Sequence, residues 1–185
     1  EYRLENNCLT ITQYARAHSA LGRNKKCSVT ITVADTWTDL KLHTNVGDVD
    51  LSGLNVLSLD LRADVGDIDL ENCTLETSTL DANVGDIDLE DCTFTSMEIT
   101  SNVGDVDLDC KEDLSDYHIE LGTGVGDVNV NDTYCHRSYS NQGDSSHSLT
   151  ISNDTGDISL TYWFQKRAEH LTVPALSFSL SFILM

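Results

Sequence analysis

Aspartates are the residues of this chain whose spacing most suggests chemistry. Two of them follow a glycine in each copy of a 19-residue repeat, separated by one apolar residue. Carboxylate oxygens are preferred ligands of Ca²⁺, and stacked copies would bring them close enough to share a cation. The sequence therefore predicts a candidate calcium site at eight aspartates: Asp48, Asp50, Asp67, Asp69, Asp86, Asp88, Asp105 and Asp107.

A structural role for the same aspartates is the interpretation that we favour. An aspartate beside a glycine turn commonly accepts hydrogen bonds from turn amides, and its partner two residues later would face water. The nine-residue motif of calcium-binding β-rolls is absent from the sequence. We therefore expect no cofactor, with Ca²⁺ as the alternative that a calorimetric titration would decide.

The repeat that carries these aspartates predicts the fold class. The Gly-Asp pair recurs at intervals of 19 residues from Gly47 to Gly104, and then after 22 and 30 residues at Gly126 and Gly156. Apolar and polar residues alternate around it, as in a strand with one buried and one wet face. We therefore expect an all-β, parallel β-solenoid in which each copy forms one coil and like residues stack about 4.8 Å apart.

Setting the copies in register predicts which side chains face the core. Columns that begin at Val49, Leu51, Val56 and Leu61 are expected to point inward. The same is expected of the five valines directly before the glycines, Val46, Val65, Val84, Val103 and Val125. A column of corner amides and carboxylates should hydrogen-bond along the solenoid axis; it comprises Asn45, Asp64, Asn83, Asn102 and Asp154.

The chain is expected to divide into three parts. Residues 1–44 would form strands and an entry coil, with a basic loop over 14–26 and a strand over 29–33; residues 45–160 would form the repeats. The longer intervals predict extra residues near 112–116 and an outward loop over 135–147. Residues 161–185 end in a strand with one apolar face, which would either cap its own solenoid or pair two chains as a homodimer.

Six cysteines are present, without the spacing of a zinc site. Cys73 and Cys92 share one position of the repeat and Cys110 lies one residue away, so we expect buried free thiols rather than disulfides.

Catalytic motifs are absent from the sequence, and the six histidines share no ligand spacing, so we expect no enzyme activity. Insertions in solenoids commonly bind partners. The predicted loop therefore supplies the candidate partner-binding residues Tyr134, His136, Arg137 and Tyr139.

The net charge is −20, from 31 acidic and 11 basic residues. This charge argues against nucleic acid and anionic lipid as partners, because both are bound through clustered lysine and arginine. It leaves divalent cations, basic partners or simple solubility. The chain begins at Glu1, so we expect a removed upstream segment (a signal peptide, an anchor or another domain), through which any membrane attachment would run.

The repeat resembles a known family. The strings Thr44-Asn-Val-Gly-Asp-Val-Asp-Leu51 and Ala82-Asn-Val-Gly-Asp-Ile-Asp-Leu89 look like the DUF4097 family of proposed bacterial adhesins, whose hallmark is a repeated S/V-G-D-I-x-L. The resemblance covers roughly residues 29–160. It implies a single-stranded, right-handed parallel β-helix, often tethered near a bacterial membrane, with no assigned activity and no catalytic residues to carry over.

We therefore expect a non-enzymatic module, extracellular or in the cell envelope of a bacterium, that binds an unidentified protein or glycan as an adhesin-like scaffold. One alternative is a carbohydrate-active enzyme similar to the polysaccharide lyases, which also use β-helices. Arg62 is the only arginine between Val46 and Val130, which disfavours it because lyases need a basic catalytic residue. A second alternative is the ectodomain of an envelope-stress sensor.

Overall fold

A computed structural model describes residues 2–5, 8–11 and 37–163 of the chain. The chain divides into two units, 1–34 and 35–185, each of which is described by itself. In the first unit, β1 (Tyr2–Glu5) and β2 (Cys8–Ile11) form an antiparallel pair. The expectations for 14–26, for 29–33 and for the apolar strand near the C-terminus lie outside the described residues.

The second unit consists of two seven-stranded sheets. The first sheet contains the longer strands β3 (Trp37–Thr44), β5 (Asn55–Ala63), β7 (Thr74–Val84), β9 (Thr93–Val103), β11 (Tyr117–Val125) and β15 (Asp144–Thr155), with β14 (Ser138–Asn141) at one edge. The second contains β4 (Val49–Ser52), β6 (Ile68–Glu71), β8 (Ile87–Glu90), β10 (Val106–Cys110), β12 (Val128–Val130) and β16 (Ile158–Tyr162), with β13 (Thr133–Tyr134) at one edge.

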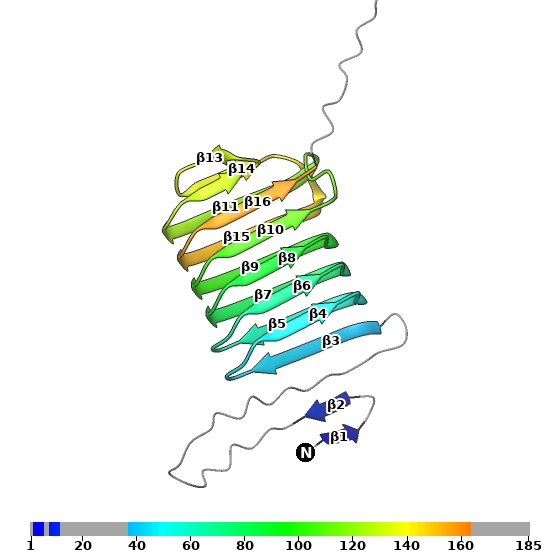
Figure 1. The fold of residues 1–185 in the computed structure, drawn as a ribbon. Helices are drawn as coiled ribbons and strands as arrows, with labels where there is room; N and C mark the ends of the chain where they lie inside the picture. Colours follow the sequence, from blue (N-terminus) through cyan, green and yellow to red (C-terminus); the bar gives the residue numbers. More distant parts are fainter. Residues whose placement is uncertain (1, 6–7, 12–36, 164–185) are drawn as a thin grey trace, which may run out of the picture. The chain divides into compact units, whose positions relative to one another are not determined.

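Each copy of the repeat supplies one strand to each sheet, and corresponding strands pair in parallel (Figure 1). The register equals the repeat length, so that Ile68 lies beside Val49 and Ile87 lies beside Ile68. The all-β fold of stacked parallel strands is thus confirmed. The described part of the chain contains no helix that could cross a bilayer.

The last two coils do not stack in the order of the sequence. Strand β15 pairs with β9 on one side and with β11 on the other, and β16 lies in the same way between β10 and β12. The coil of residues 144–162 is therefore inserted between the coils of 93–110 and 117–130 (Figure 1). The expectation that successive coils stack in chain order is wrong at this end.

Segment 135–147 is not the outward loop that its length suggests. Strand β14 pairs antiparallel with β11, and β13 pairs antiparallel with β12, so that these short strands cover the last parallel coil. A terminal coil exposes unpaired backbone groups, and pairing them with the chain's own strands removes a template for aggregation. The inserted residues thus form an end cap. The extra residues near 112–116 do connect β10 to β11, as expected, and Leu114 among them is fully buried.

The core lies between the two sheets and follows the predicted columns. The columns at Val56, Leu61, Val49 and Leu51 are buried in the middle coils. A further inward column escaped the sequence pattern because Leu57 and Ser58 both lie outside the core, which shifts the alternation by one residue. This column comprises Leu59, Ser78, Met97, Leu149 and Ile119. The hydroxyl oxygens of Ser78 and Ser101 are buried without a hydrogen-bond partner.

The valines before the glycines face outward, and the expectation that they point inward is wrong. In β9, Ser101 is buried whereas Asn102 and Val103 are both exposed, so the alternation stops two residues before the turn. The chain changes direction at Gly104, with φ near +144°, and the corner residues follow the turn rather than the strand. The five valines are 43% to 80% exposed and form an outward row: Val46, Val65, Val84, Val103 and Val125.

Glycine is required at these corners for two reasons. Gly66, Gly85, Gly104, Gly126 and Gly156 all have φ between +138° and +146°, which side chains disfavour. A Cβ atom at Gly85 would also lie 2.1 Å from the carbonyl oxygen of Gly66 in the coil below. Neighbouring coils can therefore approach each other closely at the corner, because no side chain separates the glycines.

Candidate functional site

The aspartates that follow the glycines form a hydrogen-bonded ladder along the stack. The amide nitrogen of Asp86 donates to Asp67 Oδ1 at 2.9 Å, and the amide of Asp105 donates to Asp86 Oδ1 at 2.8 Å. The same bond continues through the inserted coil, from Asp157 to Asp105 and from Asp127 to Asp157, each at 2.8 Å. We call this row the aspartate ladder; it comprises Asp48, Asp67, Asp86, Asp105, Asp157 and Asp127.

The ladder ends on the cap. The phenol of Tyr134 donates to Asp127 Oδ1 at 2.9 Å, which supplies the donor that a further coil would have provided. This bond raises the pKa of Tyr134. The structural role of the ladder aspartates, acceptance of turn amides, is thereby confirmed, and each backbone bond offsets part of the repulsion between neighbouring carboxylates.

The second column of aspartates has a different environment. Neighbouring strands of the second sheet place four aspartates side by side: Asp50, Asp69, Asp88 and Asp107. In the next strand, β16, the position beside Asp107 is occupied by Ser159. Burial, then the hydrogen bond with Asp50 and repulsion from neighbouring carboxylates, raise the pKa of Asp69 to about 6. Burial and like charges also raise the pKa of Asp88 and of Asp107. Burial and mutual repulsion of the ionised carboxylates in this column therefore destabilise the stack.

The structure brings the eight candidate calcium ligands together as two single files. Among the residues that the structure describes, no three or more of His, Cys, Asp and Glu gather in an arrangement that could hold a metal ion. The ladder carboxylates already accept hydrogen bonds from backbone amides, and calcium binding stays a prediction for the calorimetric titration.

The candidate partner residues belong to the end cap. Tyr134 lies in β13 with its ring 4.7 Å from that of His136, in an edge-to-face contact. The carbonyl oxygens of His136 and Arg137 accept hydrogen bonds from the amides of Val128 and Thr123, and Tyr139 lies opposite Leu121. The structure thus places all four on one short segment, with Tyr134, His136 and Arg137 exposed.

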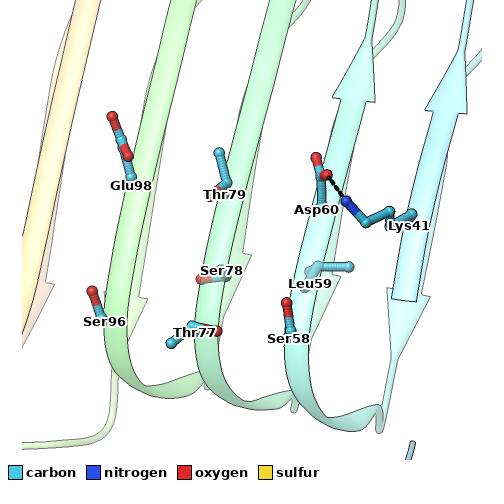
Figure 2. A pocket seen from close by; sticks show the side chains of 9 residues that line it. All are labelled: Lys41, Ser58, Leu59, Asp60, Thr77, Ser78, Thr79, Ser96 and Glu98. Atoms are coloured by element: carbon cyan, nitrogen blue, oxygen red, sulfur yellow. Dashed lines mark hydrogen bonds and ion pairs between the residues drawn. The ribbon is translucent and has the colours of Figure 1, made fainter. Parts of the chain in front are cut away.

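The outer face of the first sheet carries a shallow polar groove of about 320 Å³ (Figure 2). Hydroxyls and carboxylates from neighbouring strands line it, and Lys41 pairs with Asp60 at 2.8 Å at one end. Its lining residues include Ser58, Asp60, Thr77, Thr79, Ser96 and Glu98.

Lysine and arginine side chains of the array are held by aspartates. Arg62 contacts Asp81 at 3.1 Å and Asp64 at 3.3 Å, and Lys111 pairs with Asp91.

A second groove, of about 360 Å³, lies beside Tyr117. The ring of Tyr117 contacts the rings of Phe94 and His147, and its hydroxyl donates to the carbonyl oxygen of Phe94 at 2.6 Å. Both grooves are shallow surface features rather than enclosed pockets.

The cysteines expected in the interior are free and buried at Cys73, Cys92 and Cys110, and Cys135 is partly exposed. Cys110 faces inward although it is one residue out of phase, because β10 continues for one more residue where Asp91 of the coil before adopts a positive φ. Burial, with the charges of Glu112 and Asp109, raises the pKa of Cys110 to about 12, and the hydrogen bond with Cys73, followed by burial, raises the pKa of Cys92.

Comparisons with known proteins support the family resemblance that the repeat suggests. The chain matches no curated relative and no solved structure. A family model described as Toastrack DUF4097 matches residues 6–161, which include both grooves, both aspartate columns and the end cap. The chain therefore belongs to the Toastrack DUF4097 family of domains of unknown function.

Proposed function

We propose that the protein is a non-enzymatic binding scaffold of a bacterial cell surface or envelope, adhesin-like in presenting one rigid side to another macromolecule. The observation that carries this proposal is the aspartate ladder. In it, hydrogen bonds of 2.8–3.2 Å from backbone amides to carboxylate oxygens hold equivalent side chains in register from coil to coil. A surface with a fixed repeat loses little conformational entropy when an extended partner binds, so it suits repetitive contact with a polymer or another protein.

The negative charge of the protein indicates which class of partner it attracts. The net charge is −20, and the array's Lys41, Arg62 and Lys111 pair with aspartates. An acidic surface of this kind attracts basic macromolecules and repels anionic ones. The polysaccharide lyase alternative needs a base beside its substrate, and the pairing of Arg62 with two carboxylates supports binding over catalysis.

The winding of the solenoid is part of the same proposal. Parallel strands of one sheet, such as β5 and β7, are joined through β6 of the other sheet. Such connections are right-handed in nearly all proteins, and we propose this hand here. An experimentally phased electron-density map would decide it.

The function is tested by immobilising the protein and adding three polymers: polylysine, polygalacturonate and a neutral glucan. The expected result is saturable binding of polylysine that weakens with salt, with no chemical change in any of the polymers. Steady release of unsaturated products from polygalacturonate, followed in the ultraviolet, would overturn the proposal in favour of a lyase. Failure of all three to bind would also contradict it.

A further inference from the structure

An exposed row of aliphatic side chains runs along one corner of the stack. Backbone hydrogen bonds join the corners in the order Val46, Val65, Val84, Val103, Thr155 and Val125, because the amide of each following glycine donates to the next residue of the row. We call this row the valine ridge. Of the eight large apolar side chains exposed among the described residues, five belong to it, so the exposed apolar surface is concentrated there.

The ridge has the dimensions of a helix-binding surface. Six positions at about 4.8 Å per coil span about 24 Å. Side chains on one face of an α-helix recur about every 5.4 Å, so a helix of about 16 residues could keep one apolar residue near each valine. An extended strand repeats on one face about every 6.6–6.8 Å and would lose register within two coils.

Charged side chains border the ridge. The exposed aspartate ladder follows it one glycine later in every coil, and Asp64 and Asp154 lie on its other side among the corner asparagines. A second copy of this chain would bring the same carboxylates and the same net charge of −20 to the contact, which disfavours self-association. A partner with an apolar stripe flanked by lysine or arginine matches both features.

We propose that the valine ridge docks a basic amphipathic helix of a partner polypeptide, with the apolar stripe of the helix on the valines and its cations beside the aspartate ladder. The inference rests on the proposed function, because it names the partner class of the same scaffold. Binding combines burial of aliphatic surface with charge attraction.

The test uses an 18-residue model peptide of leucine and lysine, with leucine at positions that share one helical face, and a scrambled peptide of the same composition. The ridge variant is Val65→Thr, Val84→Thr and Val103→Thr together; threonine is tolerated there because Thr155 already occupies one place in the row. Leu57→Thr, at an exposed apolar residue away from the ridge, is the matched control. A second variant, Asp67→Asn with Asp86→Asn and Asp105→Asn, removes charge but keeps an oxygen that can accept the ladder amides.

The wild-type protein should bind the amphipathic peptide and bind the scrambled peptide less well. The ridge variant should bind at least about tenfold more weakly with an unchanged melting temperature, and Leu57→Thr should bind within about twofold of wild type. The asparagine variant should show a weaker salt dependence. If the triple valine variant melts early, Val84→Thr alone should still weaken binding by about two- to threefold.

Equal affinity of the ridge variant and the wild-type protein would overturn the docking surface and leave the scaffold function intact. Equal binding of the scrambled peptide, or binding of polylysine without binding of the amphipathic peptide, would likewise overturn the helix as the partner. Binding of neither polylysine nor the peptide would overturn the inference and the proposed function together.

Discussion

At the scale of single residues, the four residues of the corner Asn-Val-Gly-Asp have different roles. The glycine permits the turn and the close approach of two coils, and the aspartate accepts the amide of its neighbour in the next coil. These two roles could be predicted from the spacing and from turn chemistry. The outward position of the valine could not, because period-two alternation gives no sign of where a strand ends.

Replacing Gly85 with alanine should destabilise the fold strongly. A Cβ there would lie 2.1 Å from the Gly66 carbonyl oxygen, and φ is +145°, so we expect a loss of about 3 kcal/mol or more in the free energy of unfolding. Gly53→Ala is the control: its φ is +63° and no atom lies within 4 Å of the added Cβ, so it should cost about 1 kcal/mol. Urea unfolding measures both, and equal losses would contradict the close-approach argument.

Asp69→Asn should stabilise the protein at neutral pH. The pKa of Asp69 is raised to about 6 in the folded chain from an ordinary value of 3.8, so its ionised form is disfavoured by folding above that range. Lowering the pH below 6 protonates the carboxyl of the folded state first, so the cost falls and is gone below the ordinary value of 3.8. The variant should therefore melt above wild type at about pH 7.5, and the difference should shrink by about pH 4.5. A difference that is absent at pH 7.5, or that grows on acidification, would contradict the assignment.

Ser101→Ala should also raise stability. The Ser101 hydroxyl is buried without a hydrogen-bond partner, and its neighbour in the adjacent coil is Ala82. Removing the oxygen relieves an unmet desolvation cost, for which we expect a gain of about 1 kcal/mol in the free energy of unfolding. Ser96→Ala, which deletes a hydroxyl bonded to Ser148 at 2.9 Å, should not give this gain. Thermal melts of both variants compare them directly.

At the scale of elements, the order of the last coils is the feature that the sequence pattern could not supply. The copies at 117–130 and 144–162 carry the same columns, so either could lie beside the coil of 93–110. The hairpin-like strands β13 and β14 decide between them, because they pair antiparallel with β12 and β11 and make that coil the end of the stack. Side-chain columns predict which residues face inward, but not which coil is terminal.

Cysteine pairs test this order in solution. Ser96 lies directly beside Ser148, with their oxygens 2.9 Å apart, whereas His118 lies on the far side of Ser148. The pair Ser96→Cys with Ser148→Cys should therefore react with a short thiol crosslinker, and the pair Ser96→Cys with His118→Cys should not. Mass mapping of the linked peptides gives the answer. Crosslinking of only the second pair would show that the coils stack in chain order instead.

At the scale of the whole molecule, the repeat predicted an all-β stack of parallel coils because every copy repeats the same local choices of apolar, glycine and aspartate residues. The division of the stack into two sheets came from the structure. The aspartates that the sequence offers as calcium ligands lie in two files, and those of the ladder accept backbone amides, so calcium binding stays a prediction. The valine ridge could be identified only from the structure, in which five valines face outward beside the aspartate ladder.

The central claim is that this acidic stack is a binding scaffold for basic partners, and one titration tests it most directly. The wild-type protein is titrated in a calorimeter with the leucine–lysine peptide at about 0.05 M and about 1 M salt, and with a peptide in which glutamate replaces every lysine. We predict a saturable heat at low salt that weakens at high salt, and none with the glutamate peptide. Tighter binding of the glutamate peptide, or no heat with the lysine peptide at low salt, would contradict the claim.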